Sequence, residues 1–280
     1  MTKGNIEMNI SATMVKDLRE RTGAGMMDCK KALTECDGDE EKAVAWLREK
    51  GLSKAAKKAG RSTTEGLITI ALAADGKAGA MSEVKCETDF VAKNEELVAM
   101  AEGIASKALE MKTGDVAALP AEITDLTALI GKIGENMQVG QLTYMTVSGT
   151  GIIGSYVHSN KKLGVLVELT GDASPELAKD IAMQIAATNL ICVSPDQVPA
   201  ETLAQEREIY LSQAKEEGKP AQITKKIVEG RIRKFYQEVC LVEQAFIKDD
   251  KKTIKDLLGK NAAVTRFCRF TMGAPGFFQI

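Results

Sequence analysis

Gly66-Leu-Ile-Thr-Ile-Ala-Leu72 and Gly151-Ile-Ile-Gly-Ser-Tyr-Val157 are two copies of one internal repeat, the most informative feature of the sequence for its architecture. The offset of 85 residues between them also relates Gly79-Ala-Met-Ser-Glu-Val84 to Gly164-Val-Leu-Val-Glu-Leu169. Each copy contains two strand-like runs joined by a tight turn and followed by a helical pattern. Because a two-stranded hairpin is only marginally stable alone, each copy must pack its sheet against helices. The repeat therefore predicts two related α+β subdomains.

The two copies differ in the connection between the second strand and the helix. Gly79 and Leu97 are 18 positions apart, whereas Gly164 and the matching Leu177 are 13 apart. The first copy therefore holds an insertion, which falls in residues 85–94 and contains Thr88, Asp89, Phe90 and Val91. Phe90 there has two interpretations: a staple that packs against the following helix with Asp89 as its cap, or an exposed apolar plug beside a carboxylate. The local sequence does not decide between them.

Residues 11–51 have the pattern of three short helices. Thr13 is the expected cap of the first helix, the second begins at about Met26, and the third ends at Gly51. Three helices in so few residues bury only a very small core, so an apolar surface should remain exposed. Residues 53–64 are a basic connector with helical potential.

A second insertion is expected in the second copy of the repeat. Residues 201–218 and 221–239 are helical stretches joined by Gly218-Lys-Pro220, which predicts an antiparallel helical hairpin with a thin apolar seam. The expected seam residues are Leu203, Tyr210, Ala214, Ile223, Ile227, Phe235 and Val239.

The fold class that follows is α+β, with antiparallel sheets packed on helices. The predicted division is a three-helix module and linker over residues 8–60, a first subdomain over 61–148, and a second subdomain over 149–280. The helical hairpin is inserted in the second subdomain at about 198–240.

Composition excludes several classes of protein. The 280 residues carry 37 basic and 39 acidic side chains, and only 4% are aromatic. The chain therefore has neither the basic footprint nor the stacking residues typical of a nucleic-acid binder. No apolar run approaches the roughly 20 residues that span a bilayer, and the amino terminus has no signal core. We expect a cytoplasmic protein with no direct nucleic-acid or membrane contact, and six reduced, mostly packed cysteines.

Motifs for catalysis or cofactor binding are weak. Residues 149–154 satisfy the Gly-x-Gly-x-x-Gly pattern, but a hairpin turn follows them instead of the helix that a dinucleotide site needs. His158 is the only histidine and has no nucleophile setting beside it. It is either a plain hairpin-end residue or a partner contact. We expect no cofactor, no metal and no enzymatic activity, and instead docking on another protein.

Met26 and Met27 are typical of a recognition surface. Adjacent helical residues point about 100° apart, so one of them can enter the core while the other stays outside. Methionine is also common at adaptable binding surfaces. Partner contact is expected for at least one of the two.

Long motifs in this sequence resemble the elongation factor Ts family. Met14-Val-Lys-Asp-Leu-Arg-Glu-Arg-Thr-Gly-Ala-Gly-Met-Met-Asp-Cys-Lys-Lys-Ala-Leu33 is similar to the amino-terminal signature of that family. Thr88-Asp-Phe-Val-Ala-Lys93 is similar to its second signature. The resemblance extends over residues 11–272 and includes Lys132-Ile-Gly-Glu-Asn136, His158 and Val228-Glu-Gly-Arg231.

The resemblance implies guanine-nucleotide exchange on elongation factor Tu, in its GDP-bound and nucleotide-free states. It implies that the amino-terminal module resembles a ubiquitin-associated (UBA) domain and docks on the nucleotide domain of the GTPase. Asp89 and Phe90, within Thr88–Val91, would enter near the magnesium site and release GDP. By position, Arg19, Met26, Met27 and Lys30 would carry the module's contact; Ile133, Gly134, His158 and Ile247 match interface or core positions.

The sequence also departs from the family pattern. Residues 271–280 stand where relatives commonly continue with an acidic helical tail, and Lys248 follows Phe246-Ile247 where relatives have an apolar residue. Met8 is a candidate initiator. Two other hypotheses remain: an adaptor that binds ubiquitin-like or unfolded chains through residues 11–51, and a thiol or histidine enzyme.

Overall fold

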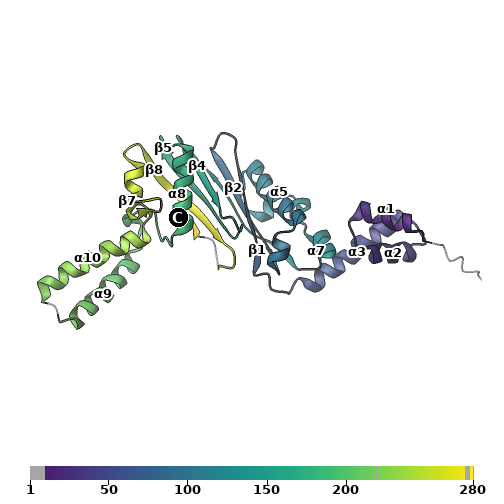
Figure 1. Cartoon of the computed structure of the whole chain (residues 1–280), viewed down its shortest axis with the longest axis horizontal. Coiled ribbons are helices and arrows are strands. Elements are labelled where there is room, and N and C mark those ends of the chain that lie inside the picture. The colour runs from purple at the N-terminus through teal and green to yellow at the C-terminus, as the bar shows by residue number, and fades with distance from the viewer. Residues whose placement is uncertain (1–9, 219, 275–277, 280) are drawn as a thin grey trace, which may run out of the picture.

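The computed structural model describes residues 10–218, 220–274 and 278–279 of an elongated molecule. Three helices form one end, a three-stranded and a four-stranded sheet with their covering helices form the middle, and the pair α9, Ala200–Glu216, and α10, Ala221–Val239, projects at the other end (Figure 1). Met8, the candidate initiator, lies outside the described residues. The mixture of helices and antiparallel sheets confirms the predicted α+β class.

Each repeat forms a hairpin that a third strand extends, and the same helix position follows it. Leu72 lies opposite Gly79 in the first hairpin and Val157 lies opposite Gly164 in the second, so the offset of 85 residues holds for the pairing register. The predicted repeat is thus correct at the level of single residue pairs. The first sheet has the order β1-β2-β3 and the second β4-β5-β8-β9. The elements are β1 Glu65–Leu72, β2 Ala78–Cys86, α5 Glu95–Met111 and β3 Met137–Thr146, then β4 Gly151–Val157, β5 Leu163–Gly171, α8 Pro175–Ala187, β8 Ala262–Thr271 and β9 Phe278–Gln279.

The two sheets pack against each other, and a helix covers the outer face of each: α5 on the first sheet and α8 on the second (Figure 1). Successive strand residues point to opposite faces, so Leu67 packs under α5 while its neighbour Ile68 packs between the sheets. A Cβ on Gly164 would lie 2.5 Å from the Ile68 side chain, and a Cβ on Gly79 would lie 3.3 Å from Ile153. The two glycines, equivalent in the repeat, therefore let the sheets approach closely.

Three helices form the amino-terminal end: α1 Ala12–Thr22, α2 Met26–Glu35 and α3 Glu40–Lys58. Two predictions about them were wrong. Ser11, and not Thr13, caps α1, because its hydroxyl accepts the amide hydrogen of Met14 at 3.1 Å. The third helix does not end at Gly51 but continues to Lys58. A Cβ on Gly131 of α7, Thr127–Ile133, would lie only 3.3 Å from the Gly51 Cα, so α3 packs closely on the first subdomain at this point, and this packing supports the helix through Gly51.

The insertion in the second repeat consists of α9, Ala200–Glu216, and α10, Ala221–Val239, which contact each other along their length (Figure 1). The predicted seam is correct for Ala214 and Phe235, which are buried, but not for Ile223, which is 48% exposed. Val228 and Ile232 are buried instead. The reason is the phase of α10: after Pro220, the inward face contains residues 224, 228, 232 and 235.

Shorter elements complete the part of the chain that the structure describes. In that part no helix is long and apolar enough to cross a membrane, and no cluster of metal-ligating side chains is present. The six cysteines are free thiols, and five of them are buried, as predicted. The shorter elements are α4 Asp89–Ala92, η1 Val116–Ala118, α6 Ala121–Thr124, α7 Thr127–Ile133, η2 Pro195–Gln197, η3 Leu241–Glu243, β6 Ala245–Phe246, β7 Asp249–Thr253 and α11 Ile254–Leu258.

Candidate functional site

The insertion between β2 and α5 forms the one-turn helix α4, which presents Phe90 to solvent. Thr88 caps this turn and Asn94 caps α5 directly after it. Val91 and Ala92 pack into the core of the first subdomain, so they anchor the turn from inside. Phe90 points the other way and is 81% exposed, more than any other large apolar side chain among the described residues. The structure therefore excludes the staple interpretation and supports the exposed plug.

Charged groups surround Phe90. Asp89 pairs with Lys93 at 2.8 Å, and the Lys93 ammonium lies 6.0 Å from the centre of the Phe90 ring. The hydrogen bond from Lys93 lowers the pKa of Asp89 below its ordinary value, and the charge of Lys162 lowers it further. Asp89 is therefore ionised at neutral pH. The exposed tip is an apolar ring with a carboxylate and an ammonium group at its side.

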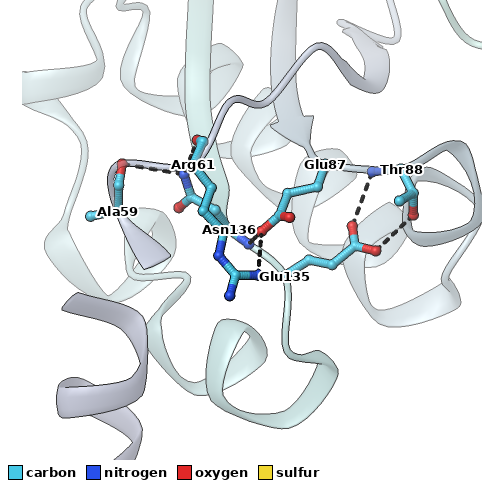
Figure 2. Close-up of polar contacts among 6 residues, drawn as sticks. All are labelled: Ala59, Arg61, Glu87, Thr88, Glu135 and Asn136. Carbon is cyan, nitrogen blue, oxygen red and sulfur yellow. Dashed lines mark hydrogen bonds and ion pairs between the residues drawn. The ribbon is translucent and has the colours of Figure 1, made fainter. Parts of the chain in front are cut away.

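Two acidic side chains join the residues just before α4 to the segment that follows α7 (Figure 2). The Glu135 carboxylate accepts hydrogen bonds from the Thr88 backbone amide at 3.0 Å and from the Thr88 hydroxyl at 2.8 Å. In return, the Glu87 carboxylate accepts the backbone amide hydrogen of Asn136 at 2.6 Å. We call these four residues, Glu87, Thr88, Glu135 and Asn136, the 87/135 clasp. Charge-assisted hydrogen bonds thus fix residues 87–88 against residues 135–136, and they hold in place the residue at which α4 begins.

The clasp also reaches the end of the amino-terminal helices. Asn136 is 1% exposed, and its side-chain amide donates to the carbonyl oxygens of Arg61 at 2.8 Å and Ala59 at 3.3 Å (Figure 2). The Arg61 guanidinium lies 3.5 Å from the Glu87 carboxylate. Sequence reasoning noted residues 132–136 in the resemblance but missed this role, because no local pattern reveals partners so far apart along the chain.

The four expected contact residues of the amino-terminal module are all exposed. Arg19 lies on α1, and Met26, Met27 and Lys30 lie in the first half of α2. Met26 is 57% exposed and Met27 is 75% exposed. Neither methionine enters the core, so both side chains are accessible to a partner. Both lie at the beginning of α2, before the buried residues Cys29, Ala32 and Leu33 of that helix.

The remaining expected residues lie in three different places. Ile133 is the last residue of α7 and packs on the core, and Gly134 follows it with a φ of 93°, which favours glycine and leads the chain into the clasp. His158 is exposed at the turn between β4 and β5. Ile247 is 47% exposed between β6 and β7, beside an ion pair of Lys248 with Asp180 at 2.6 Å. The structure does not gather these residues into one site.

No catalytic arrangement accompanies the described thiols or the histidine. His158 Nδ1 lies 3.0 Å from the hydroxyl of Tyr156, and the His158 backbone amide donates to the Leu163 carbonyl oxygen across the hairpin. Burial raises the pKa of the Cys86 thiol to about 11, and that thiol donates to the Thr88 carbonyl oxygen at 3.1 Å. A nucleophilic cysteine needs a lowered pKa. The arrangement around α4 is thus suited to binding and not to covalent chemistry.

Comparisons with known proteins agree on one family. The family model described as Elongation factor TS matches residues 87–274. Elongation factor Ts of Nitratidesulfovibrio vulgaris strain DP4 is 50% identical over 281 residues, covering 95% of this chain and 96% of the relative. Elongation factor Ts of Desulfovibrio desulfuricans is 48% identical over 282 residues, covering 95% of this chain and 99% of the relative. The chain belongs to the elongation factor Ts family.

Proposed function

We propose that this protein is a guanine-nucleotide exchange factor for elongation factor Tu in translation elongation. Membership of the elongation factor Ts family supports this function. The single structural observation that carries the proposal is Phe90, an aromatic side chain that is 81% exposed on a turn whose other side is anchored in the core. A partner that buries such a ring gains its hydrophobic transfer free energy, and aromatic anchors are typical of binding hot spots.

In the proposed mechanism, Asp89 and Phe90 enter the nucleotide domain of the GTPase near its magnesium and phosphate site. The GTPase then holds GDP less tightly, GDP leaves, and GTP rebinds. The coupling is reciprocal: a factor that binds the nucleotide-free state better must weaken nucleotide binding to the same extent. No bond in the factor is made or broken, so it acts by binding and not as an enzyme.

A broad surface must contribute as well as the tip. A shift of roughly 10⁴-fold in affinity requires about 5.5 kcal/mol of differential binding. Burial of one phenylalanine contributes only about 1.5–3 kcal/mol. The rest is assigned to other contacts: the exposed set Arg19, Met26, Met27 and Lys30, and the surfaces near Ile133, Gly134, His158 and Ile247.

Each part of the chain has a place in this proposal. Residues 8–60 act as a UBA-like docking module for the nucleotide domain. Residues 61–148 carry the Phe90 tip, and residues 149–280 bind another domain of the GTPase. The antiparallel helical hairpin at about 198–240 extends the second subdomain. The protein would act in the cytoplasm on both the GDP-bound and the nucleotide-free GTPase.

Release of a fluorescent GDP analogue from elongation factor Tu tests the proposal directly. With excess unlabelled GDP present, adding the protein should accelerate the loss of fluorescence in proportion to its concentration, until the rate saturates. A release rate that stays at the spontaneous value, at concentrations up to the micromolar range, would rule out the exchange function. Binding of ubiquitin-like proteins through residues 11–51 in the same preparation would favour the adaptor hypothesis instead.

A further inference from the structure

The 87/135 clasp does more than hold two chain segments together, because its hydrogen bonds to Thr88 determine how α4 begins. The Thr88 hydroxyl donates its hydrogen to Glu135, so its lone pairs are free to accept the amide hydrogen of Val91 at 3.4 Å. That second hydrogen bond is the cap of α4. Glu135 therefore fixes the rotation of the Thr88 hydroxyl, and through it the first turn that carries Phe90.

The turn has little else to hold its outer side. It contains only the four residues Asp89–Ala92, too few for a helix to be stable by itself. Val91 and Ala92 anchor its inner side, but Phe90 is 81% exposed, and the neighbouring Asp89 and Lys93 pair with each other on the surface. The direction of the Phe90 ring thus depends on the cap at Thr88.

The same clasp is joined to the amino-terminal helices. Asn136 follows Glu135 directly, and its amide group holds the carbonyl oxygens of Ala59 and Arg61 just beyond α3. The next contact is the Arg61 guanidinium on Glu87. Three separate chain segments, 59–61, 87–88 and 135–136, therefore meet in one hydrogen-bonded unit (Figure 2).

We infer that Glu135 is a positioning residue for nucleotide exchange: it acts on the GTPase through Thr88 and Phe90 without touching it. Asn136 extends this effect by holding the connector of the amino-terminal module in a fixed relation to the Phe90 tip. The inference rests on the proposed exchange function. It goes beyond that function because it assigns a role to a carboxylate that lies behind the exposed tip.

Substitutions at both ends of the bond test the inference in the full-length protein. Glu135→Gln removes the charge at nearly constant shape, and Thr88→Val removes the hydroxyl at constant volume. Each should lower the maximal rate of GDP release by about tenfold, the effect of losing one charge-assisted hydrogen bond, and change the half-saturating concentration much less. Thr88→Ser keeps the hydroxyl and should remain close to the wild type.

A matched control exists elsewhere in the chain. The Asp256 carboxylate also accepts from a threonine amide and hydroxyl, those of Thr253, at 2.8 and 2.7 Å. Asp256 is not among the contact residues proposed above, so Asp256→Asn removes the same chemistry away from α4 and from those contacts, and it should leave the rate of GDP release unchanged. An equal fall in both variants would show a general loss of stability and would overturn the inference.

Two further readouts separate positioning from structural support. In the Phe90→Ala background, Glu135→Gln should cause no additional fall in rate, because the group that it positions is gone. Hydrogen exchange of the amides of residues 88–93 should become about tenfold faster in Glu135→Gln. An additive effect in the double variant, or unchanged amide exchange, would overturn the inference.

The amide measurement also keeps this inference separate from the proposed function. If the wild-type protein fails to accelerate GDP release, the exchange function is refuted, and the amide exchange of residues 88–93 still decides whether Glu135 positions the turn. If release is accelerated and the amides of residues 88–93 do not respond to Glu135→Gln, the function stands and the positioning role is refuted.

Discussion

Replacing Phe90 with alanine should weaken nucleotide exchange and leave the fold intact. Phe90 is 81% exposed, so its removal takes little from the core, and the free energy of unfolding should change by less than about 0.5 kcal/mol. A partner that covers this exposed part would gain about four fifths of the 1.5–3 kcal/mol for burying a phenylalanine. The expected loss is about 1.2–2.4 kcal/mol, or roughly 8- to 60-fold in the efficiency of exchange.

The assay is release of a fluorescent GDP analogue from elongation factor Tu over a range of factor concentrations, with a thermal melt of each variant. Met111→Ala is a matched control, because Met111 is also a large exposed apolar residue, 40% exposed at the end of α5. That variant should exchange as fast as the wild type. The proposed role of Phe90 is refuted if Phe90→Ala stays within twofold of the wild type, or if its lower activity is matched by a lower melting temperature.

Three further predictions concern charge, packing and thiol chemistry. Lys93→Ala should return the pKa of Asp89 toward its ordinary value of 3.8, measured by carbon-13 titration. Because the pKa is lowered in the folded protein, the ion pair stabilises the fold above pH 3.8, and this stabilisation is lost as the pH falls through the lowered pKa. An Asp89 titration that the substitution leaves unchanged would exclude the pairing. Gly164→Ala places a Cβ 2.5 Å from the Ile68 side chain of β1 and should lower the free energy of unfolding by about 1–3 kcal/mol and the melting temperature by about 2–10 °C. A calorimetric midpoint within a degree of the wild type would contradict the close packing of the two sheets. The Sγ atoms of Cys192 and Cys240 are 3.4 Å apart, and both residues are buried. Prolonged treatment with diamide, which takes up the two thiol hydrogens, should therefore form an intramolecular disulfide, detected by non-reducing electrophoresis and mass spectrometry. Cys240→Ser should abolish this disulfide, and an unchanged mass of the treated wild type would refute the prediction.

The repeat could be predicted in detail because its signals are local. Alternating apolar residues, the glycines at matching positions and the short turns specify each hairpin without reference to the rest of the chain. The structure adds that Gly79 and Gly164 serve the contact between the sheets, which required knowing that the two hairpins face each other. Glu83 and Glu168 are also related by the repeat, and both are buried. Their burial could not be predicted from residue type, because glutamate is almost never fully buried unless it is paired.

Local signals failed where another part of the chain decides the outcome. Gly51 has the appearance of a helix end, yet α3 passes through it because α7 packs against it. Ile223 was assigned to the seam of α9 and α10 from approximate spacing, but the exact start of α10 turns it toward solvent. A shift of a single residue rotates a helical side chain by about 100°, so such assignments depend on where each helix begins.

The α+β class, the two related hairpins and the insertion that carries Thr88–Val91 can be predicted from the amino-acid sequence, since each depends on residues close together in the chain. The outward direction of Phe90 cannot be predicted in this way, because it depends on the folded structure. Its direction is set by the buried Val91 and Ala92 and by Glu135, which lies 47 residues from Thr88 along the chain. Contacts between residues so far apart form only when the chain has folded, because their entropic cost is offset by the packing of the whole subdomain.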